Sequence, residues 1–181
     1  TVGTLAPVTR SVFLHTKFGD GYKKFEKSKR DFLSCRAVAL PDGNLLVAFQ
    51  NGAAAIFCGD EPVWQGDIQY KGGGPADVAF AEGALWFCFP GAGAVVKYSL
   101  RHMREELRIG GGREAAFTRP QSIWCDGGTM MLCNTGARKV CEIDLKTFMV
   151  SDYAAFEEPV RQYLKIGAAE VVLLESGIYR L

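Results

Sequence analysis

The chain has 181 residues, of which 48% are hydrophobic and 12% aromatic, so it can bury a sizeable core as one domain. Its 21 basic and 20 acidic side chains give a formal net charge of +1, and no overall field argues for nucleic acid or a membrane as partner. No apolar run approaches the ~18 residues of a spanning helix, and no signal-peptide pattern follows Thr1. We therefore expect one domain over residues 1–181, in the cytoplasm.

Residues 4–34 carry a faint β pattern and a strip of basic residues at 17–30, interleaved with Tyr22 and Phe25. The basic residues of this strip are Lys17, Lys23, Lys24, Lys27, Lys29 and Arg30. Basic side chains release counterions from nucleic acid and aromatic rings stack on bases, so the strip could bind RNA. The alternative, which we favour, is a solvated outer strand whose lysines discourage edge-to-edge pairing.

The next two segments, residues 35–74 and 75–118, each contain several short apolar runs separated by turns. Arg36 to Phe49 is interrupted by Pro41-Asp42-Gly43, and Ala76 to Phe89 follows about 40 residues later with Gly83 at the matching place. Glycine tolerates the positive φ of tight hairpin turns, so each segment predicts a β-meander.

Residues 119–157 repeat this pattern most clearly. Three apolar runs between Phe117 and Ile143 are separated by two turn signals, Asp126-Gly127-Gly128 and Asn134-Thr135-Gly136. Residues 158–181 keep the spacing, but Ala168 takes the glycine position and no clear fourth strand follows.

These segments form one internal repeat, with Val38, Val78 and Ile123 in register and Gly43, Gly83 and Gly128 in register as well. A period of about 40 residues with several strands predicts a β-propeller. Its blades bury both faces, which explains continuous apolar strands such as 85–89. We predict an all-β propeller of about five short blades, each a four-stranded antiparallel meander, with the last truncated. It could be a five-bladed ring, a ring closed by residues 2–5, or a portion of a larger propeller.

The third repeat resembles the NHL family. The matching features are the following: Gly110-Gly111-Gly112, Phe117-Thr118-Arg119-Pro120, Ile123, Asp126, Gly128, Asn134 and Arg138-Lys139-Val140. The chain departs from the family pattern at Gln50 and Pro90, where Asp or Asn is usual. The resemblance implies a propeller, and because some NHL domains bind RNA it adds slightly to that alternative.

Six cysteines are present, without a Cys-x-x-Cys pair or a neighbouring histidine. Zinc sites need paired ligands at short spacing, so we expect inert core thiols, no metal site and no cofactor. A metal or redox cluster of Cys125, Cys133 and Cys141 is the alternative.

The candidate site is the channel mouth, the end of the propeller where the innermost strands begin. The repeat alignment places five polar residues there: Arg36, Asp77, Arg119, Gln121 and Arg161. They could bind a peptide or an anionic small molecule, or they could pair with one another, and the sequence does not decide between these. We expect no catalytic residues and a binding or scaffold domain for a protein, peptide or small ligand.

RNA binding through the basic strip comes second, and a metal-dependent hydrolase comes third. The third resembles lactonases of the regucalcin type, but the asparagine of their Pro-Asn-Gly pattern is missing at Pro120-Gln121-Ser122.

Overall fold

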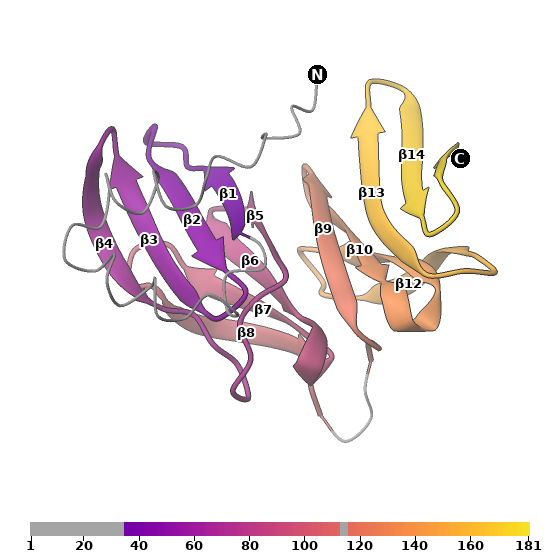
Figure 1. The fold of residues 1–181 in the computed structure, drawn as a ribbon, viewed down its shortest axis with the longest axis horizontal. Coiled ribbons are helices and arrows are strands. Elements are labelled where there is room, and N and C mark those ends of the chain that lie inside the picture. The colour runs from indigo at the N-terminus through magenta and orange to yellow at the C-terminus, as the bar shows by residue number, and fades with distance from the viewer. Residues whose placement is uncertain (1–34, 113–115) are drawn as a thin grey trace.

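The computed structural model describes residues 35–112 and 116–181, and this part of the chain is built almost entirely of β-strands. The strands form four antiparallel sheets in which neighbours along the chain are also neighbours in the sheet (Figure 1). Each sheet is therefore a meander, and the four meanders are the blades of a four-blade β-propeller. The all-β fold and the propeller are confirmed.

Three blades have four strands and the last has three. Blade 1 contains β1 (Cys35–Ala39), β2 (Leu45–Phe49), β3 (Ala53–Cys58) and β4 (Glu61–Asp67). Blade 2 contains β5 (Asp77–Ala81), β6 (Ala84–Phe89), β7 (Ala94–Ser99) and β8 (Arg104–Gly110). Blade 3 contains β9 (Pro120–Asp126), β10 (Thr129–Asn134), β11 (Lys139–Asp144) and β12 (Val150–Ala155). Blade 4 contains β13 (Val160–Ile166), β14 (Ala169–Leu174) and β15 (Ile178–Arg180).

The helices of the described part are two single turns of 3-10 helix, η1 (Pro90–Ala92) and η2 (Thr135–Ala137). Each connects the second and third strands of its blade and ends at a left-handed residue, Gly93 or Arg138. Within residues 35–112 and 116–181, no helix has the length and apolar character needed to cross a membrane.

The structure shows four blades where the sequence predicts about five. The predicted repeats 35–74, 75–118, 119–157 and 158–181 correspond to blades 1 to 4. The remaining predicted repeat, residues 4–34, and the closing strand predicted at residues 2–5 lie outside the described residues. The predicted truncation of the last repeat is confirmed, because blade 4 ends after its third strand.

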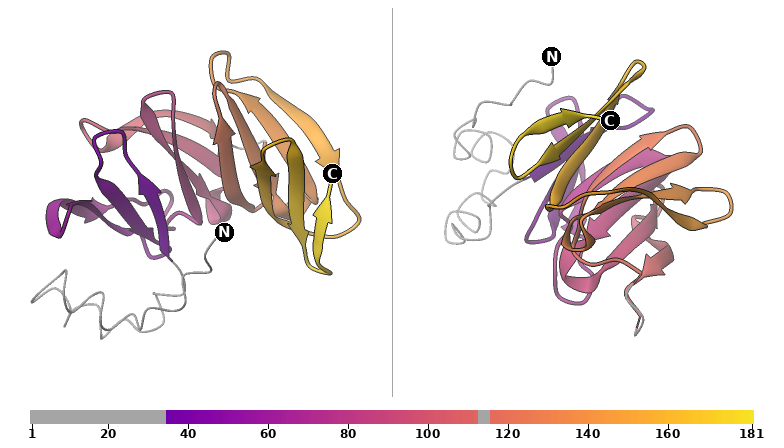
Figure 2. Two further views of the ribbon diagram at one scale, coloured as in Figure 1. Left: turned by 90° about the horizontal axis from the view of Figure 1, so that it is seen from above. Right: turned by 90° about the vertical axis from the view of Figure 1, so that its right-hand side faces the viewer.

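Successive blades meet through their innermost strands. β1 contacts β5, β5 contacts β9, and β9 contacts β13. Blades 1 and 4 therefore lie at the two ends of an arc, as the views in Figures 1 and 2 both show.

The core lies between the blades, and β6 in blade 2 shows why its sequence is apolar throughout. All six of its residues are buried. Leu85, Phe87 and Phe89 pack toward blade 1, whereas Trp86 and Cys88 pack toward blade 3. A strand covered on both faces has no polar face to alternate with, as the sequence predicted.

The hairpin glycines differ by one residue from the predicted register in two blades. Gly43 and Gly83 have the positive φ that the turns need, with values of 82° and 72°. In blades 3 and 4 the positive φ belongs to Gly127 and Gly167, so the predictions of Gly128 and of Ala168 were wrong by one position. The fourth repeat thus does have a turn glycine.

Candidate functional site

Four of the five residues predicted at the channel mouth lie at the beginning of an innermost strand. Asp77 is the first residue of β5, while Arg36, Gln121 and Arg161 are the second residues of β1, β9 and β13. The innermost strand of every described blade therefore contributes one polar side chain to the same end of the propeller.

Asp77 joins three blades. Its Oδ1 lies 3.2 Å from Nε of Arg36 in blade 1 and accepts a hydrogen bond of 3.0 Å from the backbone N–H of Val78. Its Oδ2 accepts a 2.9 Å hydrogen bond from the backbone N–H of Ile123 in blade 3. Both carboxylate oxygens are thus occupied by donors that fix the spacing of neighbouring blades.

Burial and hydrogen bonding act in opposite directions on Asp77. The side chain is only 13% exposed, and this burial raises the pKa of the carboxyl above its usual value, against the effect of the Ile123 hydrogen bond and Arg36. Arg36 keeps 48% of its side chain exposed, so it bridges the buried carboxylate and the solvent.

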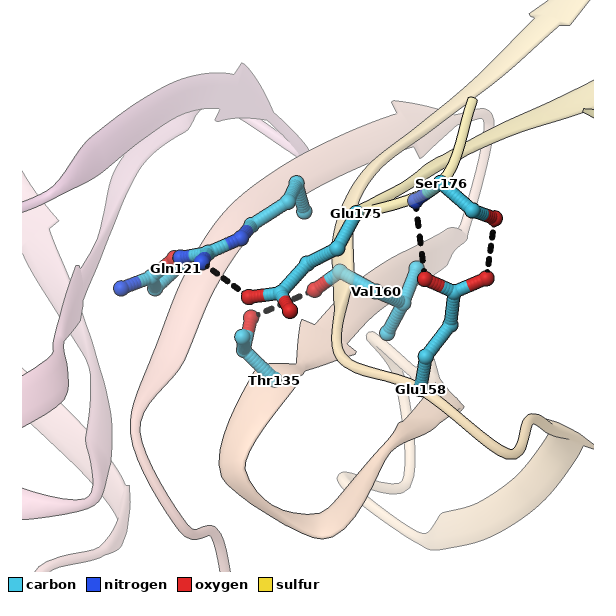
Figure 3. A network of polar contacts seen from close by, with 7 residues as sticks. Gln121, Thr135, Glu158, Val160, Glu175 and Ser176 are labelled. Carbon is cyan, nitrogen blue, oxygen red and sulfur yellow. Dashed lines mark hydrogen bonds and ion pairs between the residues drawn. The ribbon is translucent and has the colours of Figure 1, made fainter. Parts of the chain in front are cut away.

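A second polar network joins blades 3 and 4 (Figure 3). Nη1 of Arg161 donates a hydrogen bond of 3.2 Å to Oε1 of Gln121, and Nη2 of Arg161 forms an ion pair with Glu175. Both side chains of that ion pair remain more than 40% exposed. Arg161 is therefore held in place on one side and open to solvent on the other.

Two further contacts fix the start of β13 next to this network (Figure 3). The hydroxyl of Thr135, on η2, is buried and donates a 2.6 Å hydrogen bond to the carbonyl of Val160. The carboxylate of Glu158 accepts a hydrogen bond from the backbone N–H of Ser176 at 2.8 Å and another from its hydroxyl. Thr135 thereby anchors β13 to blade 3, and Glu158 anchors the turn between β14 and β15.

The structure therefore groups the predicted residues into two pairs, Arg36 with Asp77 and Gln121 with Arg161. Arg119 lies directly before β9, is exposed, and has a φ of 52° in the left-handed region. The sequence prediction missed Glu175 and Glu158. Glu175-Ser176-Gly177 is a visible turn signal, but the residue spacing does not indicate that this turn returns to the start of β13.

The chemistry available at the channel mouth is hydrogen-bond donation from guanidinium groups. Arg36, Arg119 and Arg161 outnumber the two carboxylates of Asp77 and Glu175 that lie against them. A guanidinium donates in a fixed planar fork that matches a carboxylate, and each of these arginines has an exposed portion.

The predicted cysteine cluster is wrong for blade 3. Cys141 packs toward blade 2 and Cys133 packs toward blade 4, so they lie on opposite faces of the sheet. In the described part of the chain, no three His, Cys, Asp or Glu side chains are placed to hold a metal ion. Burial raises the pKa of Cys125 and of Cys133 to about 12, which keeps both as thiols.

The basic strip at 17–30 lies outside the described residues, so the RNA hypothesis stays a prediction from sequence.

No protein-family model matches the chain, and no curated protein sequence matches it. Among solved structures it is similar to virginiamycin B lyase from Staphylococcus aureus, with a TM-score of 0.63 and 15% identity over 78% of this chain and 48% of that one. It is also similar to two computationally designed proteins, Ika4 and Ika8, both at 10% identity over 81% of this chain. Ika4 has a TM-score of 0.61 over 88% of its own chain, and Ika8 one of 0.59 over 45%. At these identities the likeness supports the propeller fold alone, and the chain spans about half the length of the lyase.

Proposed function

We propose that this chain is a non-enzymatic binding or scaffold propeller that recognises an acidic segment of a protein or peptide at the channel mouth. The observation that carries the proposal is the placement of Arg161, which contacts Gln121 and Glu175 while 43% of its side chain stays exposed. A side chain held in this way loses little conformational freedom when it binds a ligand.

The direction of charge supports an acidic ligand. Arg36, Arg119 and Arg161 supply three positive charges, and the buried carboxylate of Asp77 is already occupied by Arg36 and two backbone donors. A ligand carboxylate would add hydrogen bonds to the exposed side of these arginines without displacing the contacts between blades.

The experiment is a fluorescence anisotropy titration with a labelled Glu/Asp-rich peptide, and with a Lys-rich peptide of equal length for comparison. The test variant is Arg119→Gln/Arg161→Gln. The matched control is Arg101→Gln/Arg104→Gln, which removes two exposed arginines from the outer-strand side of blade 2.

We expect the acidic peptide to bind and the Lys-rich peptide not to bind. The test variant should lose affinity about tenfold or more, since one charge-assisted hydrogen bond contributes roughly 1.5 kcal/mol. The control should bind as the unmodified chain does. Equal losses in both variants, or no binding of the acidic peptide at low salt, would refute the proposal.

RNA recognition through Lys23 and Lys24 of the basic strip is a second candidate, supported by the density of basic residues between 17 and 30. A labelled mixed-sequence RNA should then bind with a steep dependence on salt, and Lys23→Ala/Lys24→Ala should flatten that slope. Absence of binding at low salt would exclude this candidate.

A further inference from the structure

One face of blade 4 is apolar and exposed. The face that points toward blade 3 is formed by Val160, Tyr163 and Val172, which are buried against Met131 and Val140. The opposite face of the same sheet points away from blade 3, and we refer to it as the free face.

The strand register defines the free face. Leu164 pairs with Val171 across β13 and β14, and Leu173 pairs with Ile178 across β14 and β15. Ile166 extends the same row along β13. Five large apolar side chains thus lie on one surface of three hydrogen-bonded strands.

These side chains are accessible. Ile166 is 62% exposed, Ile178 is 73% exposed and Leu173 is 38% exposed. Arg180 is the charged residue that the register adds to this surface, opposite Val171. A cluster of apolar side chains with so little charge has the composition of an interface centre.

The opposite end of the arc differs. On blade 1, Leu46 and Ile56 pack toward blade 2, and the other face carries Val47 and Phe57, each only 3% exposed. Both faces of blade 1 are therefore buried. In a second copy of the chain, the apolar sheet face available to blade 4 is the same free face.

We propose that the free face of blade 4 is a dimer interface, on which a second copy of this chain packs through its own free face. The arrangement is isologous: a two-fold axis passes through the face, and Leu173 and Ile178 of each copy lie against the apolar row of the other. Two sheets packed in this way stand about 10 Å apart and interdigitate their side chains.

The size of the face sets the strength of the dimer. Three strands about 4.8 Å apart, with about six residues at roughly 3.3 Å each, give a face of roughly 14 by 20 Å. Such an area lies below the roughly 800 Å² per partner of a standard stable complex. The dimer should therefore be weak and depend on concentration in the micromolar range.

The experiment is sedimentation-velocity ultracentrifugation of the 181-residue chain over a concentration series. The test variant is Ile166→Glu/Ile178→Glu, which places two carboxylates on the free face. The matched control is Val63→Glu/Met149→Glu, which changes two residues that are 59% and 72% exposed on blade 1 and next to β12. Circular dichroism of each variant checks that the strands are retained.

We expect the unmodified chain and the control to shift from monomer to dimer as concentration rises. The test variant should stay monomeric over the same range, with association weakened at least tenfold. A chain that is monomeric at every concentration would overturn the proposal, and so would a dimer that the test variant forms as readily as the control. Hydrogen-exchange protection of Ile178 in a strictly monomeric chain would assign the free face to residues 1–34 instead of to a second copy.

Discussion

Replacing Asp77 by alanine should destabilise the propeller more than removing its charged partner Arg36. Asp77→Ala leaves the backbone N–H groups of Val78 and Ile123 without their acceptor. A hydrogen bond to a charged acceptor contributes about 1.5 kcal/mol or more, so the two together amount to roughly 3 kcal/mol.

An opposing contribution reduces this figure. The raised pKa of Asp77 shows that burial disfavours its charged form, and alanine removes that cost. We expect a net loss of about 2 kcal/mol, which for a chain of this length lowers Tm by roughly 4–8 °C. Arg36→Gln breaks only an ion pair whose arginine is 48% exposed, and should cost at most about 1 kcal/mol.

The assay is urea denaturation of both single variants and the double variant, followed by tryptophan fluorescence. The double-mutant cycle isolates the Arg36–Asp77 coupling from the hydrogen bonds to Val78 and Ile123. If Arg36→Gln costs as much as Asp77→Ala, the ion pair and not the backbone hydrogen bonds joins the blades, and the reasoning above is wrong.

Three further outcomes follow from the same contacts. Because the folded pKa of Asp77 is raised, the stability it contributes is fully present below its unfolded pKa of about 4 and is lost as the pH rises through the folded value, so the deficit of Asp77→Asn relative to the unmodified chain should shrink from about pH 4 to neutral in a urea titration. Gly74→Ala should lower Tm strongly, since its Cβ would lie 2.2 Å from a backbone carbonyl oxygen, whereas Gly73→Ala meets nothing closer than 3.8 Å and should not. In a titration with Ellman's reagent, exposed Cys58 should react quickly and Cys133, whose pKa burial raises to about 12, only on unfolding; fast reaction of Cys133 would contradict its placement.

The sequence predicted the parts of the fold that depend on neighbouring residues. Continuous apolar runs such as β6 indicated strands covered on both faces, and paired turn signals placed the hairpins. The error at Gly127 and Gly128 has a simple cause, since adjacent glycines tolerate the same dihedral angles and the sequence cannot say which one adopts them.

The contacts of the candidate site depend on the spatial relation between blades, and periodicity does not contain it. The repeat alignment predicted correctly that Asp77 and Arg161 stand at the starts of innermost strands. It could not predict that Asp77 reaches the backbone of Ile123, which is 46 residues away, because that hydrogen bond requires a particular angle between blades 2 and 3. The same holds for Glu175, whose turn folds back on Arg161.

Blade 4 contains a mismatch between its sequence and its surroundings, and this mismatch is the strongest reason to expect a partner. A strand that faces water on one side normally alternates apolar and polar residues. In β14, Val172 points to the covered face, but Val171 and Leu173 on the free face are apolar as well. β12 at the outer edge of blade 3 instead exposes Ser151 and Asp152. β14 thus has the composition of an interior strand although one of its faces is uncovered, and a second copy packed on the free face would give it the surroundings that its sequence fits.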